Sequence, residues 1–315
     1  MKEPSKEQWK MAQKFSYVRR FETNDTLLPQ CWIVLRIDGH HFTQFCDQYQ
    51  FEKPNDIRCL NLMNDSARAL MEYFPDIVMA YGQSDEYSFA FRPSTQLYKR
   101  RTSKLVSLGV SCFTAHFVMG WPRYFPGVPL TVVPTFDGRT VCYPNQKAFK
   151  DYFAWRQADC HINNLYNTCF WTLVRRGGLS NLDATERLKG TDAAQKNEIL
   201  FTQFSINYAK EPAQFRKGTT LARLAHPAPA VAEQLPVVPI PGPPPAAPVE
   251  PAAGSQAPSS AAAPATAAPA STTSTQGTEE TIVERPLPHP ERIATLFCDI
   301  IPESFWEEHP ELLAE

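Results

Sequence analysis

The segment IVLRIDG, residues 33–39, is apolar on both faces of an extended chain and ends in an aspartate and a glycine. It predicts a central strand over residues 31–38, because a strand buried on both faces reads as a nearly continuous apolar run. A second acidic segment, YGQSDEYSF at residues 81–89, places Asp85 and Glu86 at a turn between apolar runs. Carboxylates at strand ends hold Mg²⁺ against nucleotide phosphates. If the two segments converge, the sequence predicts a phosphoryl- or nucleotidyl-transfer site.

The elements around these segments follow the order of a ferredoxin-like split unit. In that unit a strand, a helix, a hairpin, a second helix and a strand follow one another. The end of the first strand then lies next to the hairpin tip, so we expect an α+β fold with Asp38 and Asp85 as neighbours. The pattern predicts helices over 6–22, 55–74 and 94–120, a hairpin formed by 77–82 and 87–91, and strands at 132–133 and 138–141.

The composition is typical of a soluble intracellular protein without a global affinity for nucleic acid. Of the 315 residues, 43% are hydrophobic, and the formal net charge is −2. Any nucleic-acid partner would therefore have to be held by local patches. The eight cysteines form no CxxC pair and no zinc spacing, which indicates buried thiols in a reducing compartment. The chain has no signal-peptide core and no apolar run of membrane-spanning length, so we expect no membrane partner and a location in the cytoplasm, the nucleus or both.

The composition changes sharply near residue 226, where a long segment rich in Pro, Ala, Ser, Thr and Gly begins. Such a segment cannot bury enough apolar surface to offset the entropy lost on ordering. We predict a disordered insertion over 226–283 and an ordered tail at 284–315 that packs back on the domain. The residues before the insertion divide into a catalytic core at 1–150 and a C-terminal region at 151–225.

Asp38 and Asp85 are the candidates for bridging two metal ions. In two-metal sites the ions lie about 3.5–4 Å apart, one activating the attacking hydroxyl and one holding the phosphates. Glu86 is the third candidate, and Gly39 lets the backbone come close enough for its carbonyl to be a ligand. The alternative is that Asp38-Gly39 only ends a strand and that residues 84–86 are ordinary turn residues. The presence of both segments in one split unit favours the functional interpretation.

A basic cluster follows the hairpin at Lys99, Arg100, Arg101 and Lys104. Arg101 and Lys104 are three apart and would share a helix face. Such a face suits a triphosphate, because Arg forms forked hydrogen bonds and Lys supplies a point charge. The alternative is a solvated helix end. Lys53 is a weaker phosphate candidate, for which the alternative is a solvated loop lysine.

The third informative segment is WRQADCHINNLYNT, residues 155–168. Asparagine is a poor helix former, so a recognition surface for bases or phosphates would explain its frequency here. The alternative is a group of N-cap residues at a helix start, and His161 alone is more typical of a structural histidine. At helical spacing the segment has an apolar stripe (Ala158, Ile162, Leu165, Cys169) and a polar stripe (Arg156, Asp159, Asn163, Asn167). Later loops add further cationic candidates for phosphate contacts: Lys189, Lys196, Arg216 and Lys217.

Together these motifs resemble those of the eukaryotic tRNA-histidine guanylyltransferases, fungal members in particular. The resemblance covers about residues 8–225 and 290–313 and leaves out the Pro/Ala-rich segment. Family members often carry arginine where this chain has His40 and histidine where it has Thr43. The matching segments are residues 14–21 (KFSYVRRF), 31–42 (CWIVLRIDGHHF), 51–56 (FEKPND), 81–89 (YGQSDEYSF), 99–104 (KRRTSK), 155–168 (WRQADCHINNLYNT) and 196–201 (KNEILF).

The resemblance implies a polymerase-palm-like catalytic domain with additional helical elements, and a nucleotidyltransferase that extends RNA in the 3′–5′ direction. ATP would activate the 5′-monophosphate of histidine tRNA as an adenylylated end. The 3′-hydroxyl of GTP would then attack, and pyrophosphate would finally be released. The resemblance also implies two Mg²⁺ ions, a homotetramer and selection of the tRNA through its anticodon. Residues 151–225 would form the tRNA-binding and activation region.

The resemblance also implies a role for individual residues. Asp38, the Gly39 carbonyl and Asp85 would hold the two Mg²⁺ ions, with Glu86 supporting the site as a catalytic residue. The other residues at the bound nucleotides would be His40, His41, Phe42, Thr43, Lys53, Ser84, Arg101 and Lys104. The residues in contact with tRNA would be Arg156, His161, Asn163, Asn167, Lys189 and Lys196.

Two other functions stay open on the sequence alone. A palm-type nucleotide cyclase or diguanylate-type synthase would also pair a strand-end aspartate with an acidic hairpin, but it would not explain the Arg/Asn-rich segment at 155–168. A non-catalytic RNA-binding relative would keep the fold without the chemistry. The intact acidic and basic residues argue against that relative: Asp38, Asp85, Glu86, Arg101 and Lys104.

Overall fold

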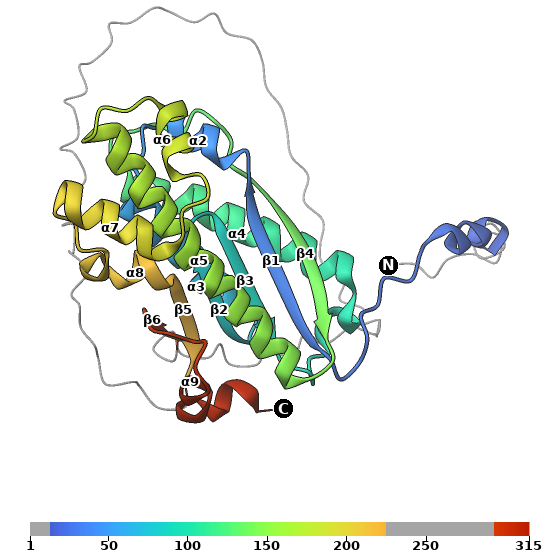
Figure 1. Cartoon of the computed structure of the whole chain (residues 1–315). Coiled ribbons are helices and arrows are strands. Elements are labelled where there is room, and N and C mark those ends of the chain that lie inside the picture. The colour runs from blue at the N-terminus through green and yellow to red at the C-terminus, as the bar shows by residue number, and fades with distance from the viewer. Residues whose placement is uncertain (1–12, 225–292, 315) are drawn as a thin grey trace, which may run out of the picture. The chain divides into compact units, whose positions relative to one another are not determined.

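The computed structural model describes residues 13–224 and 293–314. The insertion predicted at 226–283 lies outside the described residues. Residues 24–224 and 293–314 belong to one compact unit, whose elements are labelled in Figure 1. Residues 13–23 belong to a second unit and contain the 3-10 helix η1 (Ser16–Phe21). The helix expected over 6–22 is therefore described only in its second half.

The larger unit is built on a six-stranded antiparallel sheet with the order β4-β1-β3-β2-β5-β6 (Figure 1). The order β4-β1-β3-β2 is that of the ferredoxin-like split unit, so the predicted α+β fold class is confirmed. Residues 132–133, predicted as a strand, are irregular. The strands are β1 (Trp32–His40), β2 (Ile77–Gln83), β3 (Glu86–Phe91), β4 (Thr135–Tyr143), β5 (Thr219–Arg223) and β6 (Ile293–Leu296).

The helix α3 (Ile57–Tyr73) begins where the sequence predicts it. The Asp56 carboxylate caps its N-terminus by accepting the backbone N–H group of Arg58 at 3.0 Å. The helix buries one amphipathic face, which includes Leu62 and Leu70. The other helices are α2 (Phe42–Gln48), η2 (Leu97–Arg100), α4 (Thr102–Tyr124), α5 (Gln146–Arg175), α6 (Asn181–Leu188), α7 (Ala193–Phe204), η3 (Tyr208–Lys210), α8 (Ala213–Lys217), α9 (Glu303–Glu308) and η5 (Pro310–Leu313).

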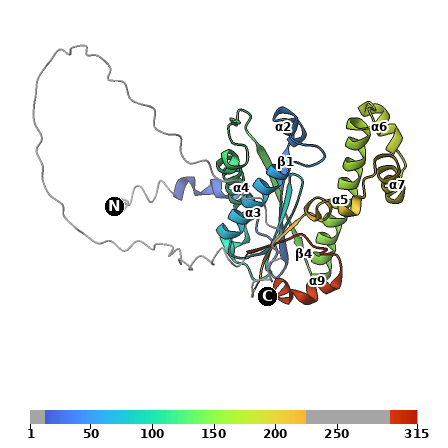
Figure 2. The ribbon, with the colours of Figure 1, turned by 90° about the vertical axis from the view of Figure 1, so that its left-hand side faces the viewer.

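The two faces of the sheet carry separate hydrophobic cores. Side chains alternate along a strand, so Ile33 and Leu35 of β1 pack with α3 and α4, whereas Trp32 and Val34 pack with α5. Figure 2 shows α3 and α4 on one side of the sheet and α5 on the other. A third cluster joins the C-terminal half of α5 to α6 and α7. The long helix α5 therefore links the sheet to a small helical region.

The helix α4 is long and apolar enough to cross a membrane, with 23 residues and a mean hydropathy of 1.3 over its most apolar window. The prediction that no apolar run reaches this length is therefore wrong. Phe113, Phe117 and Trp121 of α4 are buried in the core that it shares with α3 and the sheet. Core helices pass the same test, so length and composition alone do not assign α4 to a membrane.

The C-terminal tail packs against the same unit. β6 pairs with β5 up to Arg223, which lies opposite Ile293. The buried side chain of Gln157 on α5 holds the next part of the tail. It donates to the carbonyl of Cys298 at 2.9 Å and accepts the N–H group of Ile300 at 2.8 Å. The residues after the long insertion thus complete the sheet and one of its cores.

Candidate active site at the end of β1 and the central hairpin

Asp38 and Asp85 converge, as the split unit predicts. Asp38 of β1 lies opposite Glu86 of β3 in the antiparallel register. The N–H group of the adjacent Gly39 donates to the backbone carbonyl of Asp85 at 3.1 Å. Because β1 continues to His40, Asp38 and Gly39 lie within the strand, and the alternative of a strand-ending turn is wrong. The two acidic segments thus meet at one end of the sheet.

In the described part of the chain, no basic side chain forms an ion pair with the carboxylate of Asp38 or Asp85. Burial raises the pKa of Asp85; the hydrogen bond from Ser84 opposes this rise, and the charge of Asp38 adds to it. Burial also raises the pKa of Asp38, against the lowering effect of Arg36. Two neighbouring, desolvated carboxylates without an ion-pair partner are a ligand set that a divalent cation stabilises.

Gly39 leaves the space beside these carboxylates open. A Cβ atom at this position would lie 3.0 Å from Oδ2 of Asp85 and 2.6 Å from Cδ2 of the Phe42 ring. The Phe42 ring is buried, so a larger residue would force it to move. Glycine therefore keeps the backbone accessible next to Asp85. With both carboxylates, this geometry fits the Mg²⁺ site that the sequence predicts.

Glu86 has a different environment from the two aspartates. Arg156 Nη1 lies 3.1 Å from both of its carboxylate oxygens, and Arg36 Nε lies 3.7 Å from Oε2. Burial raises the pKa of Glu86, although Arg156 and Arg36 both act to lower it. The described residues contain no group of three or more His, Cys, Asp or Glu side chains that could hold a metal. Glu86 is therefore placed to orient arginines rather than to serve as a third metal ligand.

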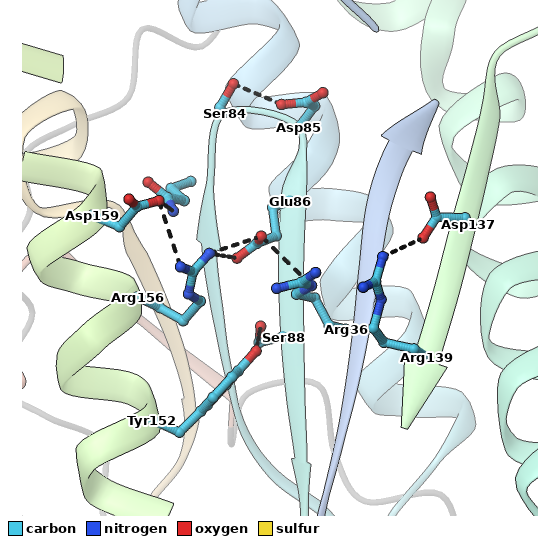
Figure 3. A network of polar contacts seen from close by, with 11 residues as sticks. Arg36, Ser84, Asp85, Glu86, Ser88, Asp137, Arg139, Tyr152, Arg156 and Asp159 are labelled. Carbon is cyan, nitrogen blue, oxygen red and sulfur yellow. Dashed lines mark hydrogen bonds and ion pairs between the residues drawn. The ribbon is translucent and has the colours of Figure 1, made fainter. Parts of the chain in front are cut away.

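Arg156 lies on the buried face of α5, although the sequence places it on an exposed polar stripe. Only 5% of the residue is exposed. Its charge can be buried because Glu86 of β3 faces it and forms an ion pair with it. Figure 3 shows the resulting network, which continues from Arg156 to Asp159 at 3.6 Å. Asp159 also accepts a hydrogen bond from Gln83 at 3.3 Å. In this structure Arg156 joins α5 to the hairpin, and the tRNA contact expected at Arg156 stays a prediction.

The rest of the polar stripe on α5 is exposed. Asn163 and Asn167 are exposed and follow Asp159 at four-residue steps along the helix, and His161 is exposed beside them. The helix begins at Gln146, so these asparagines lie far inside it, and the N-cap alternative is wrong. The polar stripe begins at Asp159, which contacts Gln83 at the hairpin tip. From there it continues along α5 away from the hairpin.

The two stripes nevertheless differ from the prediction in detail. Ile162, expected in the apolar stripe, is 63% exposed. Asn164 is buried instead: its Oδ1 accepts from Asn55 at 2.8 Å and its Nδ2 donates to the Tyr208 hydroxyl at 2.9 Å. No pattern in the sequence distinguishes this structural asparagine from the exposed ones.

Lys53 lies next to the polar face of α5. Its Nζ is 3.0 Å from Oδ1 of Asp47 and 5.8 Å from the centre of the Trp171 ring. Arg175, near the end of α5, donates to the Lys53 carbonyl at 3.1 Å. Trp171 follows Asn167 by one helical turn, so the two side chains lie on the same face of α5. Because Lys53 lies beside Trp171, the loop that carries Lys53 is next to the exposed asparagines. The structure brings these predicted contacts together.

Arg101 and Lys104 do not lie near the carboxylates of their own chain. Arg101 forms an ion pair with Asp25 at 3.1 Å and bridges to Thr26, in the segment that precedes β1. Asp38 lies at the other end of β1, roughly 20 Å from Trp32 at about 3.4 Å per strand residue. The predicted shared helix face is also wrong, because α4 begins at Thr102 and Arg101 is only its N-cap.

Two residues of the site, Asp137 and Arg139 of β4, are not among those predicted from the sequence. In the register, Asp137 lies opposite Asp38, and Arg139 lies opposite Arg36. Asp137 and Arg139 are about half exposed and 3.5 Å apart, and both appear beside β1 in Figure 3. A row of carboxylates thus lies next to a row of arginines on the α5 side of the sheet. The Asp-Gly pair at residues 137–138 repeats that at 38–39 and was the signal available in the sequence.

The remaining predicted residues are distributed over several elements. Ser84 Oγ donates to Oδ1 of Asp85 at 2.8 Å. His40, His41 and Phe42 line a cavity next to Asp38, whereas Thr43 is exposed outside it. The cationic candidates have local partners: Lys189 pairs with Glu186, Lys196 donates to the Thr191 carbonyl, Arg216 to the Glu211 carbonyl, and Lys217 to Asp299.

Comparison with known proteins agrees with this arrangement. A family model described as tRNAHis guanylyltransferase matches residues 15–144, and one described as the Thg1 C terminal domain matches residues 147–302. The tRNA(His) guanylyltransferase of Schizosaccharomyces pombe is 56% identical over 210 residues, which cover 67% of this chain and 80% of the relative. The probable tRNA(His) guanylyltransferase of Mus musculus is 44% identical over 302 residues, which cover 96% of this chain and 88% of the relative.

Solved structures show the same fold. The crystal structure of the tRNA(His) guanylyltransferase from Saccharomyces cerevisiae has a TM-score of 0.64 and 49% identity, and the match covers 66% of this chain and 93% of that chain. A bacterial Thg1-like protein, solved in complex with ATP, has a TM-score of 0.57 at 22% identity over 68% of this chain and 88% of that chain, which is a likeness of fold. The chain belongs to the tRNA(His) guanylyltransferase family and is a nucleotidyltransferase with the palm-type fold of that family.

Proposed function

We propose that this protein adds a guanylate to the 5′ end of histidine tRNA, with two Mg²⁺ ions held by Asp38, Asp85 and the Gly39 carbonyl. The observation that supports this most strongly is the convergence of the two aspartates without a cationic partner in the described residues. Relatives named tRNA(His) guanylyltransferase that are more than half identical to this chain support the choice of substrate.

The chain's own residues would act mainly by binding and orienting. Bound Mg²⁺ would lower the pKa of the attacking hydroxyl and neutralise phosphate charge. Arg36 and Arg139 are paired two residues along the strands from the pair Asp38 and Asp137. At this position they can donate hydrogen bonds to phosphate oxygens. Glu86 accepts hydrogen bonds from Arg156 and forms an ion pair with Arg36 at 3.7 Å, which helps to keep the Arg36 guanidinium in this position.

The two nucleotides would act in turn. The 5′-phosphate of the tRNA would first take up the adenylyl group of ATP, and pyrophosphate would leave. The 3′-hydroxyl of GTP would then attack that phosphate and displace AMP, and a second pyrophosphate would finally be released from the added nucleotide. Lys53, Asn163 and Asn167 border the region beside the hairpin tip and supply donors for the activating nucleotide and the RNA end.

A homotetramer is part of the proposal, and the position of Arg101 and Lys104 is consistent with an assembly of several chains. In one chain these cations lie at the end of the sheet opposite the carboxylates. A phosphate-binding role for them therefore requires the carboxylates of a neighbouring chain. Sedimentation of the wild type against an Arg101→Glu and Lys104→Glu double variant would test whether they lie at a contact between chains.

The direct test is incubation of the protein with 5′-monophosphorylated histidine tRNA, ATP, GTP and Mg²⁺. A one-nucleotide 5′ extension that requires both nucleotides is expected. When ATP is present and GTP is left out, an adenylylated 5′ end should accumulate. Formation of a cyclic or dinucleotide product from GTP alone, without RNA extension, would favour the cyclase or synthase alternative instead.

A further inference from the structure

The outer strand β4 carries a strip of side chains that point to the α5 side of the sheet. Directly paired strand residues point to the same face, and the β1 partners of the strip include Trp32 and Val34, which pack against α5. At about 3.4 Å per residue the strip is roughly 20 Å long, and its acidic end lies opposite Asp38. A stacked nucleic-acid strand advances about 3.4 Å per nucleotide, so the strip is long enough for several nucleotides. The strip consists of Asp137, Arg139, Val141 and Tyr143.

The strip changes from charged to apolar with distance from the proposed metal site (Figure 3). Within the described residues, Arg139 forms only a 3.5 Å ion pair, with Asp137. Its β1 partner Arg36 likewise forms only a 3.7 Å ion pair, with Glu86. Both guanidinium groups therefore keep N–H donors for phosphate oxygens. Further along the strip Val141 is 39% exposed, so the strip combines positive charge near the metal site with uncovered apolar surface beyond it.

Trp155 of α5 lies beside the strip and is held there by its neighbours. Its ring stacks on the Arg156 guanidinium, which lies 3.6 Å from the ring centre and is itself paired with Glu86. The ring of Tyr152, one helical turn earlier, lies 6.2 Å from the Trp155 ring and 5.1 Å from the Tyr143 ring, between centroids. Yet 56% of Trp155 is exposed, so one side of a held ring stays uncovered. The fold thus presents an exposed aromatic face next to the two arginines of the sheet.

We infer that Trp155 stacks on the first nucleobase of the RNA substrate, an inference that rests on the proposed function. Exposed aromatic rings beside arginines bind nucleic acid, because the ring stacks on a base and the cations pair with the backbone. An RNA strand brings one phosphate per nucleotide to Arg36 and Arg139, whereas an apolar partner would leave both charges without compensation. Stacking on a ring that Arg156 holds would place the 5′-phosphate of the RNA near Asp38 each time the substrate binds.

The test measures how strongly RNA binding depends on the first base, with and without the ring. The ligands are 5′-monophosphorylated histidine tRNA and the same RNA with an abasic first nucleotide, each labelled at its 3′ end. Fluorescence anisotropy without ATP or GTP gives dissociation constants for the wild type, Trp155→Leu, which has no ring, and Trp155→Phe, which keeps one. Tyr73→Ala is the matched control, because Tyr73 is 49% exposed and belongs to α3 on the other side of the sheet (Figure 2). Circular dichroism and sedimentation report the fold and the assembly of each variant.

The wild type and Tyr73→Ala should bind the abasic RNA about tenfold more weakly than the intact RNA, because the base has lost its stacking partner. Trp155→Leu should bind both RNAs with the weaker constant, since removal of either partner abolishes the same contact. Trp155→Phe should restore part of the difference. If Trp155→Leu does not fold, Trp155→Phe provides the test, because a smaller ring should lower the discrimination to about threefold.

Three results would overturn the inference. They are a wild type that does not discriminate between the two RNAs, a Trp155→Leu or Trp155→Phe protein that discriminates as strongly as the wild type, and a smaller assembly of Trp155→Leu in sedimentation. The last result would place the ring between copies of the chain. Binding needs no turnover, so a wild type that shows the expected discrimination but fails to extend RNA contradicts the proposed function and not the stacking.

Discussion

Arg156 of α5 donates from one nitrogen to both carboxylate oxygens of Glu86, each at 3.1 Å, and the Arg156 side chain is only 7% exposed. Glu86 of β3 lies opposite Asp38 of β1 in the sheet. The ion pair therefore holds α5 next to Asp38, a proposed metal ligand. The Trp155 ring stacks on the guanidinium at 3.6 Å and restricts its position further. The helix with the exposed asparagines is thereby held in register with the carboxylates.

The first prediction concerns this ion pair. Arg156→Met leaves the buried Glu86 with Arg36 alone, at 3.7 Å. Removal of one partner of a buried pair costs on the order of 3 kcal/mol, so urea unfolding should show a loss of about that size. Adding Glu86→Gln should restore part of it. Lys189→Met, which breaks an exposed pair with Glu186, is the control and should change stability by less than about 0.5 kcal/mol. An Arg156→Met protein as stable as the wild type would contradict this account.

The second prediction concerns Asp85 and metal. Its pKa is raised in the folded protein, so the folded state binds more protons than the unfolded state between the two pKa values. Stability therefore falls as pH rises through that window, and the loss persists above it. Asp85→Asn should raise the Tm of the metal-free protein at neutral pH. Mg²⁺ should raise the Tm of the wild type and have little effect on the variant.

Scanning calorimetry in EDTA and in excess Mg²⁺ tests this second prediction. Asp151→Asn is the control, because Asp151 is 63% exposed and pairs with Lys147 in the same helix. Its response to Mg²⁺ should equal that of the wild type. An Asp85→Asn protein that is less stable than the wild type in EDTA would mean that the carboxylate is already compensated inside the protein.

The third prediction concerns the connection between β5 and β6. Arg223 and Ile293 are directly paired, and antiparallel neighbours can be joined by a short hairpin. A chain in which a short Asn-Gly turn replaces residues 225–292 should unfold cooperatively and keep 5′ addition. Deletion of everything after residue 224 removes Trp306, which is 2% exposed, and should instead expose Phe149 and its apolar neighbours and cause aggregation. Loss of cooperative unfolding in the hairpin variant would show that the segment contributes to the fold.

The convergence of Asp38 and Asp85 could be predicted because topology determines it. Apolar periodicity gives the order of strands and helices, and that order brings the end of β1 to the hairpin tip. The start of α3 at Asp56 follows from local capping chemistry in the same way. These features depend on short segments or on connectivity, both of which are present in a single sequence.

The residues that the sequence misplaces depend on distant partners or on local backbone details. Arg156 is buried because Glu86 of another element faces it, which no helical pattern reveals. Arg101 lies outside α4 because Tyr98 and Lys99 adopt left-handed conformations that end the preceding turn. Asp137 belongs to the carboxylate row only through the register of β4 against β1. Such contacts require the sheet to be assembled before they can be recognised.

The central claim is that Asp38 and Asp85 form one metal site for 5′ addition, and the most direct test is a single-turnover assay of the two aspartate variants. Wild type, Asp38→Ala and Asp85→Ala are incubated with 5′-monophosphorylated histidine tRNA, ATP, GTP and Mg²⁺, and extension is resolved to one nucleotide. Circular dichroism confirms that each variant is folded. The wild type should extend the tRNA by one guanylate, and each variant should lose about a thousandfold or more in rate. A folded Asp85→Ala protein that extends the tRNA at the wild-type rate would contradict the claim.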